Sequence, residues 1–457
     1  MPNEPIPPHI SQRAEDVDHQ LIRAIGVPGL TANIVNSTIG AGIFVLPAAM
    51  AKGLGAAAPL AFLCCAAAMV LFVTCFALAG SRVSLTGGLY AYVEVALGSY
   101  LGFLAGILYC LTAVCAVAGI VNVFVDSMAG ILPSLGNPVL RIVVMAVVYG
   151  ILVFINVRGV REGAGAVGFV TLAKLLPILL FLGAGLFFIH PANLVWPTLP
   201  DSNSLGQSVV LLMFAFVGIE VALIPSGEVK EPARTVPRAI YSALGCTTII
   251  YLLIQVVAQG TLGPELANYK DAPLAEAAAR FLGPVGRTIL LIGATVSAFG
   301  FVTSDILSSP RMIFALGRDG TIPRISNWLA RVHPIYRTPD IAIYVYTGIA
   351  FVLSATGSFE KLALLSNVAV LLMYLLCFIG CWVLLGRDAG QSTHSQAVFS
   401  FPGMRLLPVL AIIAVIWILA HATRAEFAVN GIVLALASVV YLFRKSFKSP
   451  NESVAAS

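Results

Sequence analysis

Residues 36–47 read Asn36-Ser37-Thr38-Ile39-Gly40-Ala41-Gly42-Ile43-Phe44-Val45-Leu46-Pro47, and this run governs how the rest of the chain is interpreted. It lies at the centre of the first long apolar segment, residues 27–50, yet it carries two glycines and a proline. Glycine lets the backbone leave helical geometry, and unwinding frees N–H and C=O groups that hydrocarbon cannot satisfy. The run therefore predicts a membrane helix that is interrupted where its free backbone groups line a cavity or bind a ligand.

The composition places the chain among helical membrane proteins. Of its 457 residues, 59% are hydrophobic and only 10% are charged, whereas about 25% of the residues of a soluble domain are charged. Outer-membrane barrels show alternating strands of about 10 residues rather than long apolar runs. The eight cysteines form no Cys-x-x-Cys pair and have no histidine at metal-ligand spacing. We therefore expect an all-α polytopic membrane protein in a lipid bilayer, with no metal, no cofactor and no nucleic-acid partner.

Hydrophobic runs bounded by glycine, proline and charge predict twelve membrane spans. They are residues 27–50, 56–80, 98–131, 139–157, 164–190, 205–227, 238–261, 285–316, 340–357, 361–386, 405–422 and 427–444. Eighteen of the 26 Lys and Arg residues then fall in cytoplasmic segments and seven in outer ones, and Lys174 alone falls inside a span. This distribution follows the positive-inside rule with both termini cytoplasmic, so we expect a multi-pass protein of the cell membrane.

A second interrupted segment lies in the sixth span, at Phe214-Ala215-Phe216-Val217-Gly218-Ile219-Glu220. The first and sixth spans each open a block of five, and glycine-interrupted segments at corresponding positions of two halves indicate a transporter's binding site. Half-helix N-termini suit a carboxylate, and freed carbonyls suit an ammonium. Close helix packing would also explain Gly40 and Gly42 taken alone. We predict that an amino acid head group lies between the two interruptions, with its carboxylate on N–H groups of residues 40–42 and its ammonium on carbonyls of residues 214–217. The predicted contact residues at the interruptions are Thr38, Gly40, Ala41, Gly42, Phe214, Ala215, Phe216 and Val217.

Four groups of motifs are spread over nearly the whole chain. They are Ile39-Gly40-Ala41-Gly42-Ile43-Phe44-x-x-Pro47, Gly87-Gly88-x-Tyr90-x-Tyr92, Phe216-x-Gly218-x-Glu220 with Glu228-x-Lys230-x-Pro232-x-Arg234-x-x-Pro237-x-Ala239, and Pro310-Arg311 with Arg318-Asp319-Gly320-x-x-Pro323. In this order they resemble the motifs of the amino acid–polyamine–organocation (APC) superfamily, and in particular its amino acid permeases.

The resemblance implies a leucine-transporter-like fold of twelve transmembrane helices. Two inverted five-helix repeats, with discontinuous helices 1 and 6, are followed by two extra C-terminal helices. On this chain the implied divisions are a cytoplasmic N-terminal tail at residues 1–26, a first repeat at 27–190, a second, inverted repeat at 205–386, helices 11 and 12 at 405–444, and a cytoplasmic C-terminal tail at 445–457.

Three of the charged residues within the predicted spans are candidates for a functional role. Lys174 lies about ten residues inside the fifth span, roughly 15 Å deep at 1.5 Å per residue, and a charge there is costly unless it faces the bundle interior. The resemblance suggests that its amine stands where sodium-coupled relatives bind sodium; the alternative is a strut that bonds first-helix carbonyls without titrating. For Asp305 three roles stay open, namely a substrate contact, a pair with Lys174, or a hydrogen bond to a helix end. Glu220 is predicted either to gate the site, as an acid does in antiporters of the superfamily, or to cap the second half of its helix.

Aromatic residues flank the predicted site. Tyr109 resembles a helix-three tyrosine that borders the pocket in the superfamily, and a buried hydroxyl needs a partner that a substrate could supply. A role in the helical core is the alternative for Tyr109. A ring at Phe214 or Phe216 could cover the substrate as a gate, although packing against lipid or core is the ordinary explanation for either one.

Two other function classes lack their signatures in this sequence. An integral-membrane enzyme would need a motif such as His-x-x-Glu-His or Gly-x-Ser-x-Gly, and the sequence has neither. A channel would favour a repeated filter sequence or rings of like charge. We therefore expect a secondary active transporter, not an enzyme, that moves amino acids by alternating access without sodium, as a proton symporter or an exchanger; a polyamine or cationic amino acid antiporter is the alternative. The predicted partners are a small-molecule substrate, protons and the bilayer, with a homodimer left open.

Overall fold

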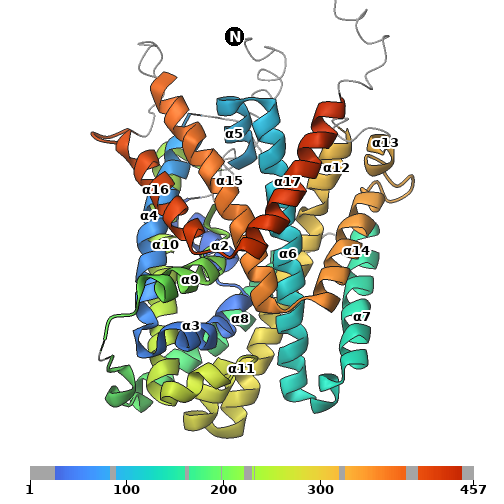
Figure 1. Cartoon of the computed structure of the whole chain (residues 1–457). Helices are drawn as coiled ribbons and strands as arrows, with labels where there is room; N and C mark the ends of the chain where they lie inside the picture. Colours follow the sequence, from blue (N-terminus) through green and yellow to red (C-terminus); the bar gives the residue numbers. More distant parts are fainter. Residues whose placement is uncertain are drawn as a thin grey trace, which may run out of the picture.

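The computed structural model describes residues 26–82, 89–159, 164–196, 198–220, 229–230, 232–318, 325–387 and 400–444. Figure 1 shows an upright bundle of long helices, and no strand is assigned within the described residues. The predicted tails (residues 1–26, of which only Gly26 is described, and 445–457) and the Gly87-Gly88 pair lie outside the described residues.

Ten of the described helices are apolar, and seven of these are long enough to cross a membrane. The seven are α4 (Pro59–Gly80), α6 (Ser99–Ile131), α7 (Pro138–Val157), α10 (Pro232–Leu262), α11 (Pro273–Ser308), α15 (Phe359–Arg387) and α17 (Arg424–Arg444). The three shorter ones are Lys174–Phe188, which contains the second half of α8 (Ala164–Gly185), and the helices α14 (Asp340–Thr356) and α16 (Leu406–Ala420). A helix satisfies its backbone groups internally, which hydrocarbon requires. The prediction of a multi-pass helical membrane protein is confirmed.

Over the described ranges the bundle also contains six short α-helices, three of which belong to the two interrupted spans. Two of them, α2 (Val27–Thr38) and α3 (Leu46–Leu54), together occupy the first predicted span, and α9 (Ser202–Leu212) begins the sixth. Figure 1 shows α2, α3 and α9 among the longer helices on one side of α6. The remaining short helices are α5 (Leu89–Leu97), α12 (Pro310–Arg318) and α13 (Ser326–Leu329).

Two helix starts differ from those that the sequence predicts. We expected the eighth span to begin at residue 285, but α11 begins at Pro273 and bends at Gly283, where φ is +65°. The charged residues Glu276 and Arg280 made its first part resemble a loop, whereas Glu276 accepts a hydrogen bond from Arg287 at 2.7 Å. Similarly, α10 begins at Pro232 and includes Pro237, after which the seventh span was expected to start.

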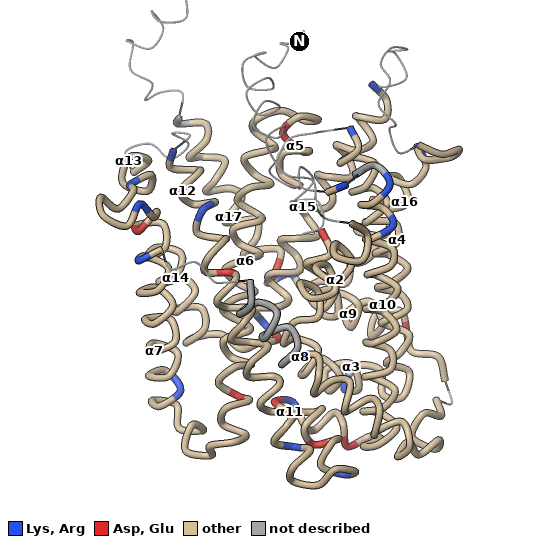
Figure 2. The backbone as a smooth tube through the Cα atoms, turned by 180° about the vertical axis from the view of Figure 1, so that it is seen from behind, with Lys and Arg blue, Asp and Glu red and all other residues tan. Residues whose placement is uncertain are grey.

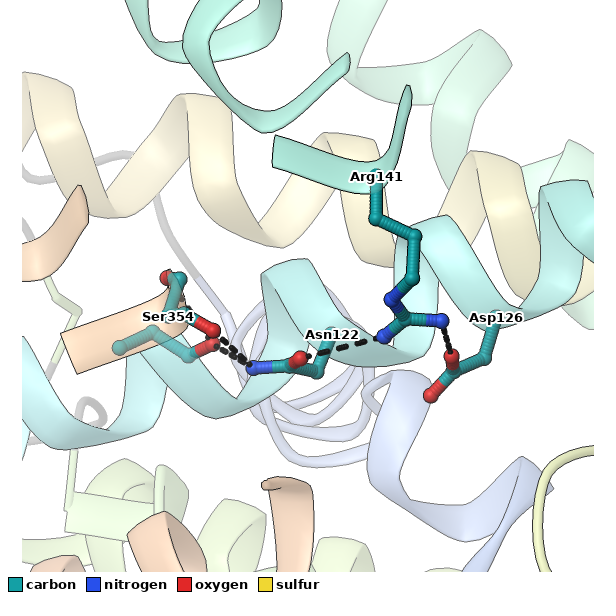
Figure 3. Close-up of polar contacts among 5 residues, drawn as sticks. Asn122, Asp126, Arg141 and Ser354 are labelled. Atoms are coloured by element: carbon teal, nitrogen blue, oxygen red, sulfur yellow. Dashed lines mark hydrogen bonds and ion pairs between the residues drawn. The ribbon is translucent and has the colours of Figure 1, made fainter. Parts of the chain in front are cut away.

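A buried polar network joins α6, α7 and α14, and Figure 3 shows most of it. Arg141 of α7 donates to the Asp126 carboxylate and to Asn122 Oδ1 (3.4 Å), both on α6. Asn122 Nδ2 donates to the Ser354 carbonyl of α14 at 3.2 Å, and the Ser354 hydroxyl lies 2.8 Å from the Tyr149 hydroxyl of α7. Buried polar groups are costly unless they are hydrogen-bonded. These five residues, called the scaffold network below, therefore hold three helices in a fixed register.

The charged residues gather toward the ends of the helices, as Figure 2 shows for the whole bundle. The end at which α6 is followed by α7, lower in Figure 1, carries three paired arginines. They form the ion pairs Arg141–Asp126, Arg280–Glu265 (2.5 Å) and Arg287–Glu276 (2.7 Å). The sequence prediction puts these three arginines outside the cell.

Candidate functional site

The first interruption is a tight turn between α2 and α3. The helix α2 ends at Thr38, Gly40 adopts an extended conformation (φ −99°, ψ −172°), and a single turn, Ala41–Phe44, precedes α3. In a continuous helix the Gly40 N–H would donate to the Asn36 carbonyl. Here it donates to the Thr38 carbonyl at 2.9 Å. The Asn36 carbonyl has therefore lost its helical donor.

Lys174 of α8 supplies a donor to that carbonyl. Its Nζ lies 2.5 Å from the Asn36 oxygen, and the residue is only 8% exposed. An ammonium at the C-terminal end of α2 also meets the negative end of the helix dipole. Both roles considered for Lys174, a fixed strut and a replacement for sodium, require this bond, so the bond alone does not distinguish them. Of the three roles considered for Asp305, a pair with Lys174 is not present among the described residues.

The second interruption follows α9 and touches the first. The chain makes one further turn, Met213–Ala215, and Gly218 then adopts a φ of +110°, which side-chain-bearing residues rarely adopt. A Cβ at Gly218 would lie 3.1 Å from the Ser37 carbonyl oxygen. Glycine is thus required at this position for two reasons, the backbone conformation and the close approach of the two broken segments.

One hydroxyl joins the two interruptions. Tyr251 of α10 is fully buried, and its hydroxyl lies 2.9 Å from the Thr38 carbonyl and 2.9 Å from the Ala215 carbonyl. Sequence reasoning missed this residue. A signal was present, because polar residues recur every fourth position of this apolar helix and so share one face; they are Thr247, Tyr251, Gln255 and Gln259.

Two predicted site residues, Thr38 and Glu220, form hydrogen bonds to backbone groups close to them in sequence. The Thr38 hydroxyl donates to the Ile34 carbonyl of its own helix at 2.8 Å. The Glu220 carboxylate accepts the Gly218 N–H at 2.9 Å, so it stabilises the turn of the second interruption. This bond resembles the capping role that was one of the two considered for Glu220.

Asp305 belongs to a neighbouring group of hydroxyls. Its carboxylate accepts hydrogen bonds from Ser309 (2.8 Å), the residue that follows α11, and from Tyr346 of α14. Tyr109 of α6 is half-buried and lies within electrostatic range of both Asp305 and Glu220. Its hydroxyl has no hydrogen-bond partner among the described residues, whereas Asp305 has two. Tyr109 therefore retains a free polar group for a ligand.

The two phenylalanines of the second interruption have different surroundings. Phe214 lies over Gly42, where a Cβ would be 3.0 Å from its ring, and meets Phe359 edge-on with ring centroids 5.4 Å apart. Phe216 is fully buried and meets Tyr251 edge-on at 5.5 Å. Phe214 is thus the ring that covers the first interruption, while Phe216 is a core residue.

Comparisons with known proteins identify the family of this chain. The sequence pattern of the amino acid permease family matches residues 25–442. The serine/threonine exchanger SteT of Bacillus subtilis (strain 168) is 27% identical over 401 residues, which cover 86% of this chain and 90% of SteT. An uncharacterized transporter of Mycobacterium tuberculosis is 30% identical over 448 residues, 94% of this chain and 93% of that protein.

A third relative, the branched-chain amino acid permease BcaP of Bacillus subtilis (strain 168), is 26% identical over 423 residues, 87% of each chain. All three relatives are named as transporters or permeases, and none as an enzyme. The family match covers more than nine-tenths of the sequence and both interruptions. The chain belongs to the amino acid permease family.

Proposed function

We propose that this protein is a sodium-independent secondary active transporter of amino acids that works by alternating access, as a proton symporter or an exchanger. The observation that carries the proposal is the contact between two interrupted helices, with Lys174 bonded to the end of the first. Freed backbone groups inside an apolar bundle are tolerated where they bind a ligand or line a cavity. A site made of such groups suits the common head group of amino acids.

We further propose twelve spans in the cell membrane, arranged as two inverted five-helix repeats with both termini cytoplasmic. The pieces α2 and α3 would form the first span, and α9 would begin the sixth, so that each repeat opens with a broken helix. The excess of Lys and Arg in the segments assigned to the cytoplasm supports this orientation.

In the proposed site, the substrate carboxylate takes N–H groups at the start of the turn that follows Gly40. The Gly40 N–H already donates to Thr38, so the donors available to a carboxylate are those of Ala41 and Gly42. The ammonium would take carbonyls of the second interruption. Since the Ala215 carbonyl accepts from Tyr251, Phe214 and Val217 are the better candidates, and Phe214 would swing away from Gly42 to admit the ligand.

The proposed coupling rests on Lys174. A protonated amine at the end of α2 supplies the single positive charge that sodium supplies elsewhere, and it occupies the Asn36 carbonyl. A sodium ion would then lack both a ligand and an electrostatic reason to bind. The amine could gain and lose a proton as the site opens to either side, which would link substrate movement to protons. If the Lys174 amine instead keeps its proton throughout the cycle, transport would not be linked to protons, and the protein would exchange one substrate for another.

The experiment that tests the proposal is uptake into liposomes that contain the purified protein. Liposomes preloaded with one unlabelled compound from a panel of amino acids and polyamines are diluted into the same compound in labelled form, with choline or sodium outside and with or without a pH gradient. We expect saturable counterflow for at least one amino acid that is unchanged when choline replaces sodium. Uptake that requires sodium would contradict the coupling, and counterflow confined to amines without a carboxylate would favour a polyamine antiporter.

A further inference from the structure

A cavity lies apart from the two interruptions. It has a volume of about 460 Å³ and is lined by the end of α3, the segment 192–200, the start of α9 and the last turns of α10. Small-molecule sites in proteins measure about 300–1,000 Å³. None of the residues of the two interruptions lines it. The cavity is therefore large enough for a ligand of its own, at the end of the bundle that the charge distribution assigns to the outside.

Gln259 of α10 brings an unpaired polar group to this cavity. It lines the cavity, it is only 2% exposed, and its Oε1 has no hydrogen-bond partner among the described residues. A buried amide without a partner is unfavourable, and a side-chain amide can offer either an acceptor or a donor. A polar ligand in the cavity would remove this penalty.

The charge of the cavity selects the class of ligand. Asp201 is the only charged residue among those that line it. Its carboxylate caps α9 by accepting the Ser204 N–H at 3.0 Å, and hydrogen bonds from Ser204 lower the pKa of Asp201, so the carboxylate stays ionised at neutral pH. The positive end of the α9 dipole is therefore already matched by an anion. A second anion would be repelled, whereas a cation would be attracted.

Two more lining residues favour a cation. Trp196 is partly exposed, and the face of an indole ring attracts ammonium groups. Asn193 donates its Nδ2 to the Gly260 carbonyl at 2.9 Å, so its remaining polar atom is an acceptor. Acceptors and an aromatic face thus surround the cavity, and no Lys or Arg lines it.

We propose that this outer cavity binds a small organic cation with a primary ammonium group, which contacts Asp201 and Trp196 while its other polar end contacts Gln259. The site is separate from the proposed transport site and goes beyond it. Because α3 and α9 are the half-helices next to the two interruptions, a ligand here would hold their outer ends together and alter the rate of transport.

Trp196 makes the proposal directly measurable. The chain has four tryptophans, and the other three are half-exposed, so we suggest a protein with W328F, W382F and W417F in which Trp196 alone emits. Putrescine is titrated at constant ionic strength, with glutarate as the anionic probe of similar length. We expect a saturable change in Trp196 emission with putrescine and none with glutarate. An equal response to both, or no saturable response to putrescine, would overturn the proposal.

Variants locate the binding. Asp201→Asn keeps a good helix cap and should weaken putrescine binding by about threefold, because solvent screens an exposed carboxylate; Gln259→Met should also weaken it. Gln255→Met, one turn away and not lining the cavity, is the matched control and should leave the affinity for putrescine within about twofold.

A change at the proposed transport site tests whether the two sites are separate. Gly42→Leu should leave the affinity for putrescine unchanged. Loss of the signal in Gly42→Leu would mean that Trp196 reports the transport site, which contradicts a separate site without contradicting transport.

Discussion

The two interruptions and the scaffold network are both polar regions inside an apolar bundle, but they are held by different kinds of contacts. At the interruptions, single donors from other helices, Lys174 and Tyr251, meet backbone carbonyls. In the scaffold network, side chains of continuous helices mainly bond one another. A carbonyl can exchange one donor for water or a ligand, whereas a buried ion pair that loses its partner leaves an unpaired charge. We therefore expect substitutions at the interruptions to affect mainly transport and substitutions in the scaffold network to affect mainly stability.

The largest effect is expected for Gly42→Leu. A side chain there would occupy the space of the Phe214 ring, which lies 3.0 Å from the Cβ position, and would cover the N–H groups assigned to the substrate. We expect uptake to fall at least about a hundredfold, because small misplacements at a site cost that much, while the protein still folds and its thermal unfolding midpoint falls by only a few °C, as overpacking predicts. Gly150→Leu, at a position with open space on α7, is the control. Wild-type uptake by Gly42→Leu would refute this placement.

Lys174→Ala should have the next largest effect. It removes the donor to the Asn36 carbonyl and a positive charge at the end of α2, and a hydrogen bond to a charged group contributes about 1.5–3 kcal/mol. We expect uptake to fall by about thirtyfold and its pH dependence to flatten, measured in liposomes from pH 5 to 9. Lys270→Ala, an exposed lysine before α11, should behave like the wild type. An unchanged pH profile in Lys174→Ala would leave the lysine as a structural strut.

A smaller loss is expected for Tyr251→Phe. This change removes one hydroxyl and leaves the carbonyls of Thr38 and Ala215 without that donor, while the ring keeps its packing on Phe216. We expect uptake to fall about tenfold, in line with about 1–2 kcal/mol for a lost buried hydrogen bond. Tyr241→Phe on the same helix, whose hydroxyl bonds Thr74, controls for the loss of a hydroxyl. Equal uptake by the two variants would show that the bridge between the interruptions has no role in transport.

The smallest effect on transport, and the clearest on stability, is expected for Arg141→Met in the scaffold network. Asp126 would be left in a half-buried position without its partner. The unfolding midpoint should fall by about 2–4 °C, while uptake per folded molecule is unchanged. Arg280→Met removes an exposed ion pair and should change the midpoint by less than about 1 °C. A transport defect in Arg141→Met without a lower unfolding midpoint would contradict the assignment of the scaffold network to stability alone.

The interruptions could be predicted because their signals are local. Gly40, Gly42 and Gly218 stand within apolar segments, and the structure ends helices near each of them. The contacts of the same residues could not be predicted, because they depend on partners that are distant in sequence. Tyr251 meets Thr38 across 213 positions, and Asp305 meets Tyr346 across 41. The spacing of residues within one helix does not show which of its faces packs against which neighbouring helix.

The surroundings of Phe214 and Phe216 illustrate the same limit. They are two residues apart, so in a regular helix they would point in different directions, but a helix that unwinds between them has no fixed periodicity. The sequence therefore left both as candidates for the covering ring. Only the packing of Phe216 on Tyr251 and of Phe214 on Gly42 distinguishes them. Glu220 was ambiguous for a related reason, because its bond to Gly218 depends on a backbone conformation that only glycine favours.

The Tyr251 hydroxyl has one proton and faces two acceptors. It can point that proton squarely at only one carbonyl at a time, so the two broken helices compete for a single donor. A ligand that bound the neighbouring carbonyls of Phe214 and Val217 and drew the Ala215 carbonyl away from Tyr251 would release the proton to Thr38 and strengthen the bond there. The reverse holds when the ligand leaves. Thermodynamic linkage then requires that whatever loosens the first helix from Tyr251 also changes the affinity of the second for its ligand, by the same factor in both directions.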